Sequence, residues 1–339
     1  MRENQIIIRM NRSIFIDISK AICIVLVVIG HFHPPFSPEW YVALVKIIYT
    51  FHMPLFMFAS GYLYAMTFKN QDYGHFLLKK VRRLVIPYFI CSLIIIAIKM
   101  SFQDFFYVPR PMTYLAFLEI LYKPKAGYFL WFVWALWWIF MLIPFFKTKL
   151  QRLLLLMIAL IVHFYPLHIT SYFCLMETQK MLIFFVSGVV MYDNKHYFSI
   201  CKKVPLFVYL IFFCVCECFF LKGSSGNPWT KFLLAIIGIA FIVSLSLELQ
   251  KVKNRVVKSI FYLLSSSSYF IYLFHTSFEG LAKAILEIMS LYNKEAISNS
   301  VFFGLIVVFV VGLGVLIPVF IYHFIVKKYR LTQLLFGIK

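Results

Sequence analysis

The sequence predicts an all-α protein, a polytopic membrane bundle of about ten transmembrane helices that forms a single domain over residues 1–339. Hydrophobic residues make up 63% of the chain and charged residues only 14%, and the mean hydropathy is +0.88. An average soluble domain carries roughly 25% charged residues. Apolar runs of about 20 residues, long enough to cross a bilayer, recur from Ile14 to Val326. These runs leave no room for a sizeable soluble domain.

The expected spans lie at 14–33, 41–66, 84–103, 127–146, 153–168, 178–193, 204–221, 231–248, 260–280 and 300–326. Most Lys and Arg residues crowd the terminal segments and alternate connections between these spans. Because loops rich in Lys and Arg stay in the cytoplasm, we expect both termini there. Residues 1–13 are then a cytoplasmic N-terminal segment, and residues 327–339 a cytoplasmic C-terminal tail. The formal net charge of +20 therefore reflects membrane topology, and we expect no nucleic-acid partner.

The first span carries ionisable residues within an apolar run, DISKAICIVLVVIGH at 17–31. Lys20 and His31 are eleven positions apart, which at 100° per residue is about 20° beyond three turns, and Asp17 precedes Lys20 by three. The three side chains therefore share one helix face, along which Lys20 and His31 are roughly 16 Å apart. This stripe predicts a polar interior, with His31, Lys20 and Asp17 as the candidate catalytic residues. Alternatively, Asp17 and Lys20 snorkel to the interface and His31 lies among the headgroups.

The second span contains FHMPLFMFASGYLY at 51–64, where His52 and the pair Ser60-Gly61 interrupt an apolar helix. Serine followed by glycine allows a bend and a close helix approach, so packing is the ordinary role of such small residues. His52 lies at a depth near that of His31. We therefore predict His52 and Ser60 as supporting or acceptor-side residues of an internal polar site.

A basic segment, KKVRRLVIPY at 79–88, precedes the third span. Lys79, Arg82 and Arg83 lie at helical spacing. Together with Lys20 they predict a basic pocket for the phosphates of a nucleotide-bearing donor. The alternative is a plain cytoplasmic flank of a transmembrane helix.

The ninth span contains SSSSYFIYLFHTSF at 265–278, with His275 followed four residues later by Glu279. The two side chains can approach on one helix face, where the acid can orient the imidazole ring. The alternative is that a backbone carbonyl holds His275. We expect no metal site, because the cysteines of CVCEC at 214–218 point to different faces of a helix.

Six motifs of the chain, and the order in which they occur, resemble those of the acyltransferase-3 family of integral-membrane acyltransferases. They are DISKAICIVLVVIGH, FHMPLFMFASGYL, the basic segment that runs into RRLVIP, GYFLWFVWAL, FFVSGVVM and SSYFIYLFH. The resemblance is to the branch that includes cell-surface polysaccharide O-acetylases and O-succinyltransferase-like proteins, and it covers nearly the whole chain.

The resemblance implies an O-acyltransferase in a bacterial-type inner membrane, which moves an acetyl or similar group from cytoplasmic acetyl-CoA to a sugar hydroxyl. The acceptor is then a surface polysaccharide or a lipid-linked oligosaccharide. By position, His31 matches the family's essential histidine, Lys20 its paired basic residue and Arg83 its donor-side arginine. Lys20 departs from the commoner arginine and lacks the planar bidentate fork. Acetyl-CoA is then a co-substrate, with no permanently bound cofactor, and a homodimer is compatible with the small-residue helix faces.

Two rival functions fit the same residues. A glycan exporter or flippase would use the intramembrane histidines for gating or proton relay. An accessory subunit of a synthase would need none of them. The basic residues cluster at one end of the predicted polar interior, and the sequence has no evident inverted repeats. Both observations favour the acyltransferase over these rivals.

Overall fold

The computed structural model describes residues 13–68, 72–103, 111–170, 172–194, 203–223 and 227–338. These residues form helices and connecting loops, with no strand among them. Eight helical segments in the described part of the chain are long and apolar enough to cross a membrane. They are Ile14–His31, Glu39–Thr67, Tyr73–Phe102, Tyr128–Phe145, Leu175–Asp193, Pro228–Leu249, Arg255–Ile288 and Ser300–Val326. The prediction of an all-α polytopic membrane bundle is confirmed.

The α-helices that build the bundle and the site are α2 (Ile14–His31), α3 (Glu39–Thr67), α4 (Tyr73–Lys80), α5 (Ile86–Phe102), α7 (Trp131–Leu142), α8 (Lys149–Phe164), α9 (Leu175–Asp193), α11 (Leu206–Lys222), α12 (Pro228–Leu249), α13 (Arg255–Ile288), α15 (Ser300–Ile321) and α16 (Arg330–Leu335). Two short helices, α6 (Ala116–Glu119) and α14 (Lys294–Ser298), lie in connections. The sequence predicts about ten spans, and the described residues contain eight segments that are long and apolar enough. The two predicted spans without such a segment correspond to α8 and α11. These two helices have 16 and 17 residues, fewer than the roughly 20 that a span usually needs.

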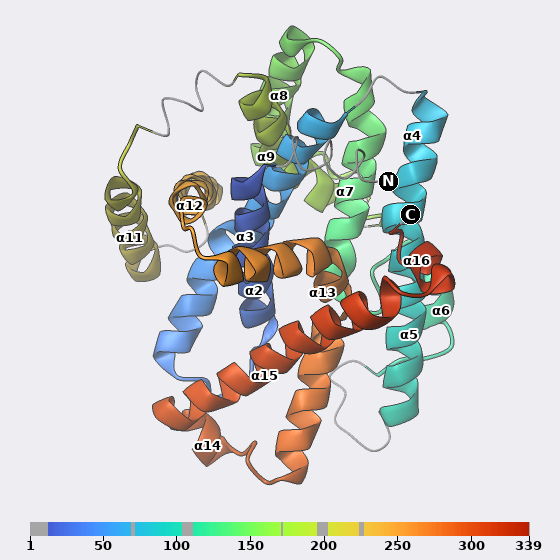
Figure 1. The fold of residues 1–339 in the computed structure, drawn as a ribbon, viewed down its shortest axis with the longest axis vertical. Coiled ribbons are helices and arrows are strands. Elements are labelled where there is room, and N and C mark those ends of the chain that lie inside the picture. Colours follow the sequence, from blue (N-terminus) through green and yellow to red (C-terminus); the bar gives the residue numbers. More distant parts are fainter. Residues whose placement is uncertain are drawn as a thin grey trace.

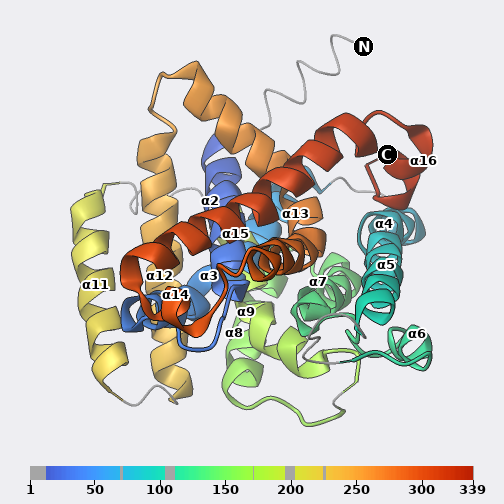
Figure 2. The ribbon, with the colours of Figure 1, turned by 90° about the horizontal axis from the view of Figure 1, so that it is seen from below.

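The central helix is α2, which packs against α3, α12, α13 and α15. It lies among these helices in both views, whereas α11 stands at one margin and α5 at the other (Figure 1, Figure 2). Cys23, Ile24, Val27 and Val28 of α2 have no exposed surface. A helix that is apolar on all sides suits such a central place, and its few polar residues therefore face other helices.

The helices α3 and α9 cross closely through two glycines. A Cβ atom on Gly61 would lie 1.9 Å from the carbonyl oxygen of Phe185, and one on Gly188 would lie 2.1 Å from that of Phe58. Real Cβ atoms do not approach backbone so closely. Glycine at both positions therefore lets the two backbones touch, as small residues do between membrane helices.

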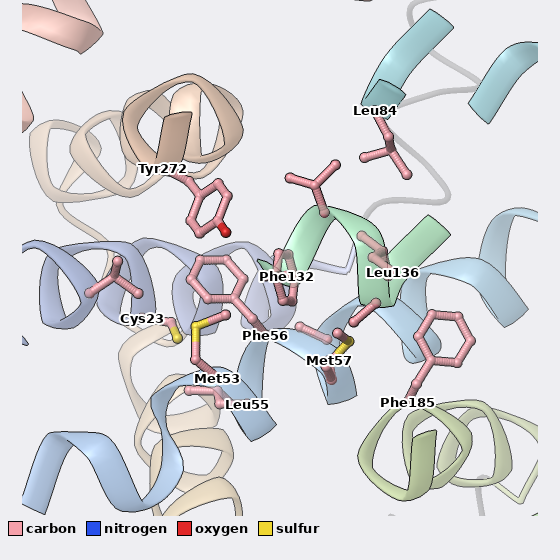
Figure 3. Close-up of a cluster of buried hydrophobic side chains, with 14 of the residues drawn as sticks. Cys23, Met53, Leu55, Phe56, Met57, Leu84, Phe132, Leu136, Phe185 and Tyr272 are labelled. Atoms are coloured by element: carbon pink, nitrogen blue, oxygen red, sulfur yellow. The ribbon is translucent and has the colours of Figure 1, made fainter. Parts of the chain in front are cut away.

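A buried apolar cluster fixes α3, α7, α9 and α13 relative to one another. Phe56 of α3, Phe132 of α7 and Tyr272 of α13 lie together in Figure 3, and Met57 and Phe185 extend the cluster toward α9. Three of these helices, α3, α7 and α13, also line the cavity described below. The cluster thereby sets the shape of that cavity.

Part of the predicted C-terminal tail, 327–339, folds against the bundle. After the π-helical turn η4 (Tyr322–Val326), α16 brings the ring of Phe336 to 5.1 Å from Phe270 and 5.8 Å from Phe274, measured between centroids. Of the predicted N-terminal segment 1–13, all but Ser13 lies outside the described residues, as does Lys339.

Candidate active site

The acidic and basic residues of α2 meet α13 at one residue. The hydroxyl of Ser265 donates to Asp17 at 2.6 Å, and the ammonium of Lys20 donates to the carbonyl of Ser265 at 3.3 Å. One turn of α2 also reaches α12, because Ser19 donates to the hydroxyl of Ser246 at 2.9 Å. The Asp17 end of α2 is thus held by polar contacts inside the bundle.

A cavity of about 440 Å³ opens beside this contact, and we call it the basic cavity. Its cationic residues are Lys20, Lys80 and Arg83, and Ser60 of α3 also lines it. Lys80 lies over an aromatic wall, with its ammonium 3.4 Å from the ring centroid of Phe140. Three basic side chains around one cavity suit a phosphorylated ligand.

Two residues predicted for this pocket, Lys79 and Arg82, are exposed and are not among the residues that line it. The physical reason is the π-helical turn η1 (Val81–Val85). Pro87 has no N–H to donate to the carbonyl four residues earlier, that of Arg83, and the wider turn changes which positions share a face. As a result Lys80, which regular α-helical spacing does not place there, lines the cavity together with Arg83.

Two histidines from different helices lie side by side at the other end of α2. The ring centroids of His31 and His275 are 5.0 Å apart. The ring of Phe129 lies 5.8 Å from His31 and 5.1 Å from His275, in edge contacts. Tyr272, which lines the basic cavity, donates its hydroxyl to the carbonyl of Phe129. Tyr272, whose ring lies 6.3 Å from that of His275, therefore connects the basic cavity to the histidine pair, which does not itself line this cavity.

The backbone fixes the tautomer of His275. Its Nδ1 lies 2.8 Å from the carbonyl of Tyr272 and 3.2 Å from that of Ile271. A carbonyl only accepts, so Nδ1 carries the proton and Nε2 presents a lone pair. Nε2 is buried and has no hydrogen-bond partner among the described residues. It is thus a preformed proton acceptor.

The predicted orientation of His275 by Glu279 is wrong in this structure. Carbonyls of the preceding turn take Nδ1 instead, because they lie within reach of any histidine in a helix. Glu279 is 2% exposed and packs toward α15, where a Cβ on Gly314 would lie 3.2 Å from its Cγ. One of its carboxyl oxygens, Oε1, has no partner within the described chain.

His52 is buried on α3, and its Nδ1 lies 2.7 Å from the carbonyl of Ile48. Its ring meets that of Tyr49 edge-on at 5.0 Å, and Tyr49 in turn lies 6.3 Å from the ring of His31. Tyr49 thus separates the two predicted histidines. The sequence offered a signal for it, since Tyr49 precedes His52 by three residues and shares its helix face.

A second cavity, of about 750 Å³, lies on the far side of Tyr49, and we call it the aromatic cavity. Aromatic side chains form much of its wall, and two lysines add positive charge: Phe36, Tyr41, Tyr49, Phe220, Lys46 and Lys231. His33 also lines it, and its Nε2 lies 3.1 Å from the hydroxyl of Tyr49. The histidine pair therefore has the basic cavity on one side, through Tyr272, and the aromatic cavity on the other, through Tyr49.

A family model described as an acyltransferase domain matches residues 13–323. The nodulation protein NolL of Sinorhizobium fredii is 34% identical over 146 residues, which is 41% of this chain and 37% of that protein. NolL of Mesorhizobium japonicum is 31% identical over 140 residues, 39% of this chain and 35% of that protein. These matches span about a third of the length of either relative. No solved structure matches the chain.

Proposed function

Because the chain belongs to the acyltransferase-3 family of membrane acyltransferases, we propose that it moves an acetyl or similar acyl group from cytoplasmic acyl-CoA to a sugar hydroxyl. The acceptor is a cell-surface or lipid-linked glycan. The observation that carries this proposal is the histidine pair between two cavities of different chemistry. Family membership also weighs against the rival glycan exporter.

The donor occupies the basic cavity in this proposal. Phosphates of CoA bind near Lys20, Lys80 and Arg83, because hydrogen bonds between charged groups are stronger than those between neutral groups. The pantetheine arm then runs past Tyr272 toward the histidines. The roughly 16 Å between Lys20 and His31 along α2 is comparable to the reach of an extended pantetheine.

The acceptor enters from the aromatic cavity. A site lined by aromatic rings with a few polar groups is typical of small-ligand pockets, and here Phe36 and Tyr49, both exposed, offer apolar faces for a sugar ring. The cavity is larger than the basic cavity and open at the opposite end of α2. A hydroxyl that passes Tyr49 reaches the histidine pair.

The reaction is an acyl transfer in which a C–O bond forms and the C–S bond of the thioester breaks. His31 takes the proton of the sugar hydroxyl as the oxygen attacks the thioester carbonyl, and the proton then passes to the departing CoA thiolate. General-base catalysis of this kind contributes typically 10²–10⁴-fold. Nε2 of His275 offers a second acceptor nitrogen for the same proton.

The direct test uses purified protein in lipid nanodiscs with radiolabelled acetyl-CoA and a glycan extract from the host. Label that enters glycan with the wild-type protein, and not with empty nanodiscs, supports the proposal. A folded protein that neither binds acetyl-CoA nor transfers label contradicts it, and a vesicle transport assay for glycan export then follows.

We expect Arg83→Ala to raise the KM for acetyl-CoA by about 10- to 100-fold, since a hydrogen bond to a charged group contributes about 1.5–3 kcal/mol. Arg83→Lys keeps the charge but loses the planar guanidinium fork. Its KM for acetyl-CoA should therefore lie between those of the wild type and Arg83→Ala. Initial rates at varied acetyl-CoA measure the effect. Arg82→Ala is the matched control, because Arg82 is exposed and does not line the cavity. Equal effects of Arg82→Ala and Arg83→Ala would refute the assignment.

We expect Tyr49→Ala to raise the KM for the glycan acceptor several-fold, because it removes an aromatic wall at the entrance to His31. The Kd for acetyl-CoA should not change, since Tyr49 lies outside the basic cavity. Kinetics at varied acceptor and calorimetry with acetyl-CoA separate the two effects. Tyr114→Ala, in an exposed connection, serves as control. Weakened donor binding with unchanged acceptor KM would contradict the placement.

A further inference from the structure

Residues 336–338 form one wall of the basic cavity, together with residues of α3, α7 and α13. The ring of Phe336 packs against Phe270 and Phe274 of α13, and local hydrogen bonds fold the segment onto the end of η4 and onto itself. Thr332 donates to the carbonyl of Val326 at 3.0 Å, and the side-chain amide of Gln333 donates to that of Lys327 at 2.6 Å. The N–H of Ile338 donates to the carbonyl of Gln333 at 2.9 Å. Residues 330–338 are therefore a folded strap across this end of the cavity.

The strap meets the backbone of Arg82 and Arg83 at Gly337. A Cβ on Gly337 would lie 2.4 Å from the carbonyl oxygen of Arg82 and 2.6 Å from the Cα of Arg83. Gly337 also has a φ of 66°, in the left-handed region that favours glycine. Glycine is thus required here both for conformation and for the close approach.

The contact falls on the π-helical turn η1 (Val81–Val85), which joins α4 to α5 and departs from regular α-helical hydrogen bonding. Arg83 is exposed at the cavity, so side-chain packing does not fix its guanidinium either. From outside this helix, the strap contacts the backbone of Arg82 and Arg83, and the hydroxyl of Tyr269 donates to the carbonyl of Leu84 at 3.0 Å. Of these two contacts, that of the strap is the one at Arg83.

Given the proposed function, on which this inference rests, we propose that the strap 330–338 is part of the donor site for the phosphates of acyl-CoA. Gly337 is a positioning residue. It brings the strap onto the backbone of Arg82 and Arg83 and so holds the Arg83 side chain in the cavity. Ile338 supplies a side chain to the wall that the donor contacts.

The test compares Gly337→Ala with Gly304→Ala in nanodiscs. A Cβ at Gly304, on α15, would meet no described atom within 4 Å, so this control measures the effect of an added methyl group alone. Gly337→Ala should weaken acetyl-CoA binding by about tenfold, the loss of one well-placed charged hydrogen bond. It should raise the KM for acetyl-CoA and leave kcat at saturating acetyl-CoA unchanged. Gly304→Ala should match the wild type in acetyl-CoA binding, in the KM for acetyl-CoA and in kcat.

A second measurement avoids any folding defect of the variant. In wild-type protein, acetyl-CoA should slow amide hydrogen exchange in residues 330–338, and Ile338→Ala should weaken acetyl-CoA binding with the backbone contact intact. Folded Gly337→Ala with a wild-type Kd, or exchange in the strap that acetyl-CoA leaves unchanged, overturns the inference while the proposed function stands. Wild-type protein that binds no acetyl-CoA overturns both.

Discussion

His31→Ala is expected to lower acyl transfer by about 10²–10⁴-fold while the protein still inserts and folds. The residue supplies the proposed general base, and its ring contacts with His275, Phe129 and Tyr49 are at centroid distances of 5.0 to 6.3 Å. Removal of the imidazole also removes these ring contacts, so the folded fraction is measured together with the rate. The initial rate of label transfer from acetyl-CoA to glycan measures the effect, with acetyl-CoA binding measured in parallel.

His168→Ala is the matched control, because His168 lies exposed in the connection after α8. His275→Ala tests whether Nε2 of the second histidine shares the proton transfer, in which case its rate also falls. Near wild-type transfer by His31→Ala would remove His31 from the mechanism. Loss of transfer together with loss of acetyl-CoA binding would instead assign it to donor binding.

Gly188→Ala is expected to destabilise the bundle by about 3 kcal/mol, at the upper end of the usual cost of overpacking. The reason is geometric. The added methyl group would lie 2.1 Å from the carbonyl oxygen of Phe58 and 2.8 Å from the amide nitrogen of Tyr62, and backbone atoms cannot rotate away as a side chain does. Thermal unfolding in nanodiscs should show a lowered Tm, and activity should fall with the folded fraction.

Gly61→Ala should behave in the same way, since its Cβ would meet the backbone of Phe185 from the other side of the crossing. Gly312→Ala on α15 is the control, because a Cβ there would meet no described atom within 4 Å. A Tm of Gly188→Ala equal to that of Gly312→Ala would mean that α3 and α9 are farther apart than described.

Much of the fold follows from helical periodicity and apolar run length, because a bilayer leaves few other ways to satisfy the backbone. The common face of Asp17 and Lys20 is one example, since both side chains reach Ser265 of α13. The close approach at Gly61 is another, since the pair Ser60-Gly61 already indicates it. In both examples the signal lies in the order and spacing of residues along a single helix.

What could not be predicted depends on contacts between helices or on departures from ideal geometry. Because of the π-helical turn η1, Lys80 and not Lys79 lines the basic cavity, and ideal α-helical spacing does not predict this. Tyr49 and Phe129 matter through their positions between elements that are distant in sequence. The carbonyls around His275 compete with Glu279 for the same ring nitrogen, and only coordinates decide that competition.

α2 and α13 touch at two levels, Asp17 with Ser265 and His31 with His275, and both helices run in the same direction between them. The two helices therefore have a defined register. A slide by one residue would shift α13 by about 1.5 Å and require a rotation of about 100° to restore the same face, so both contacts would be lost together.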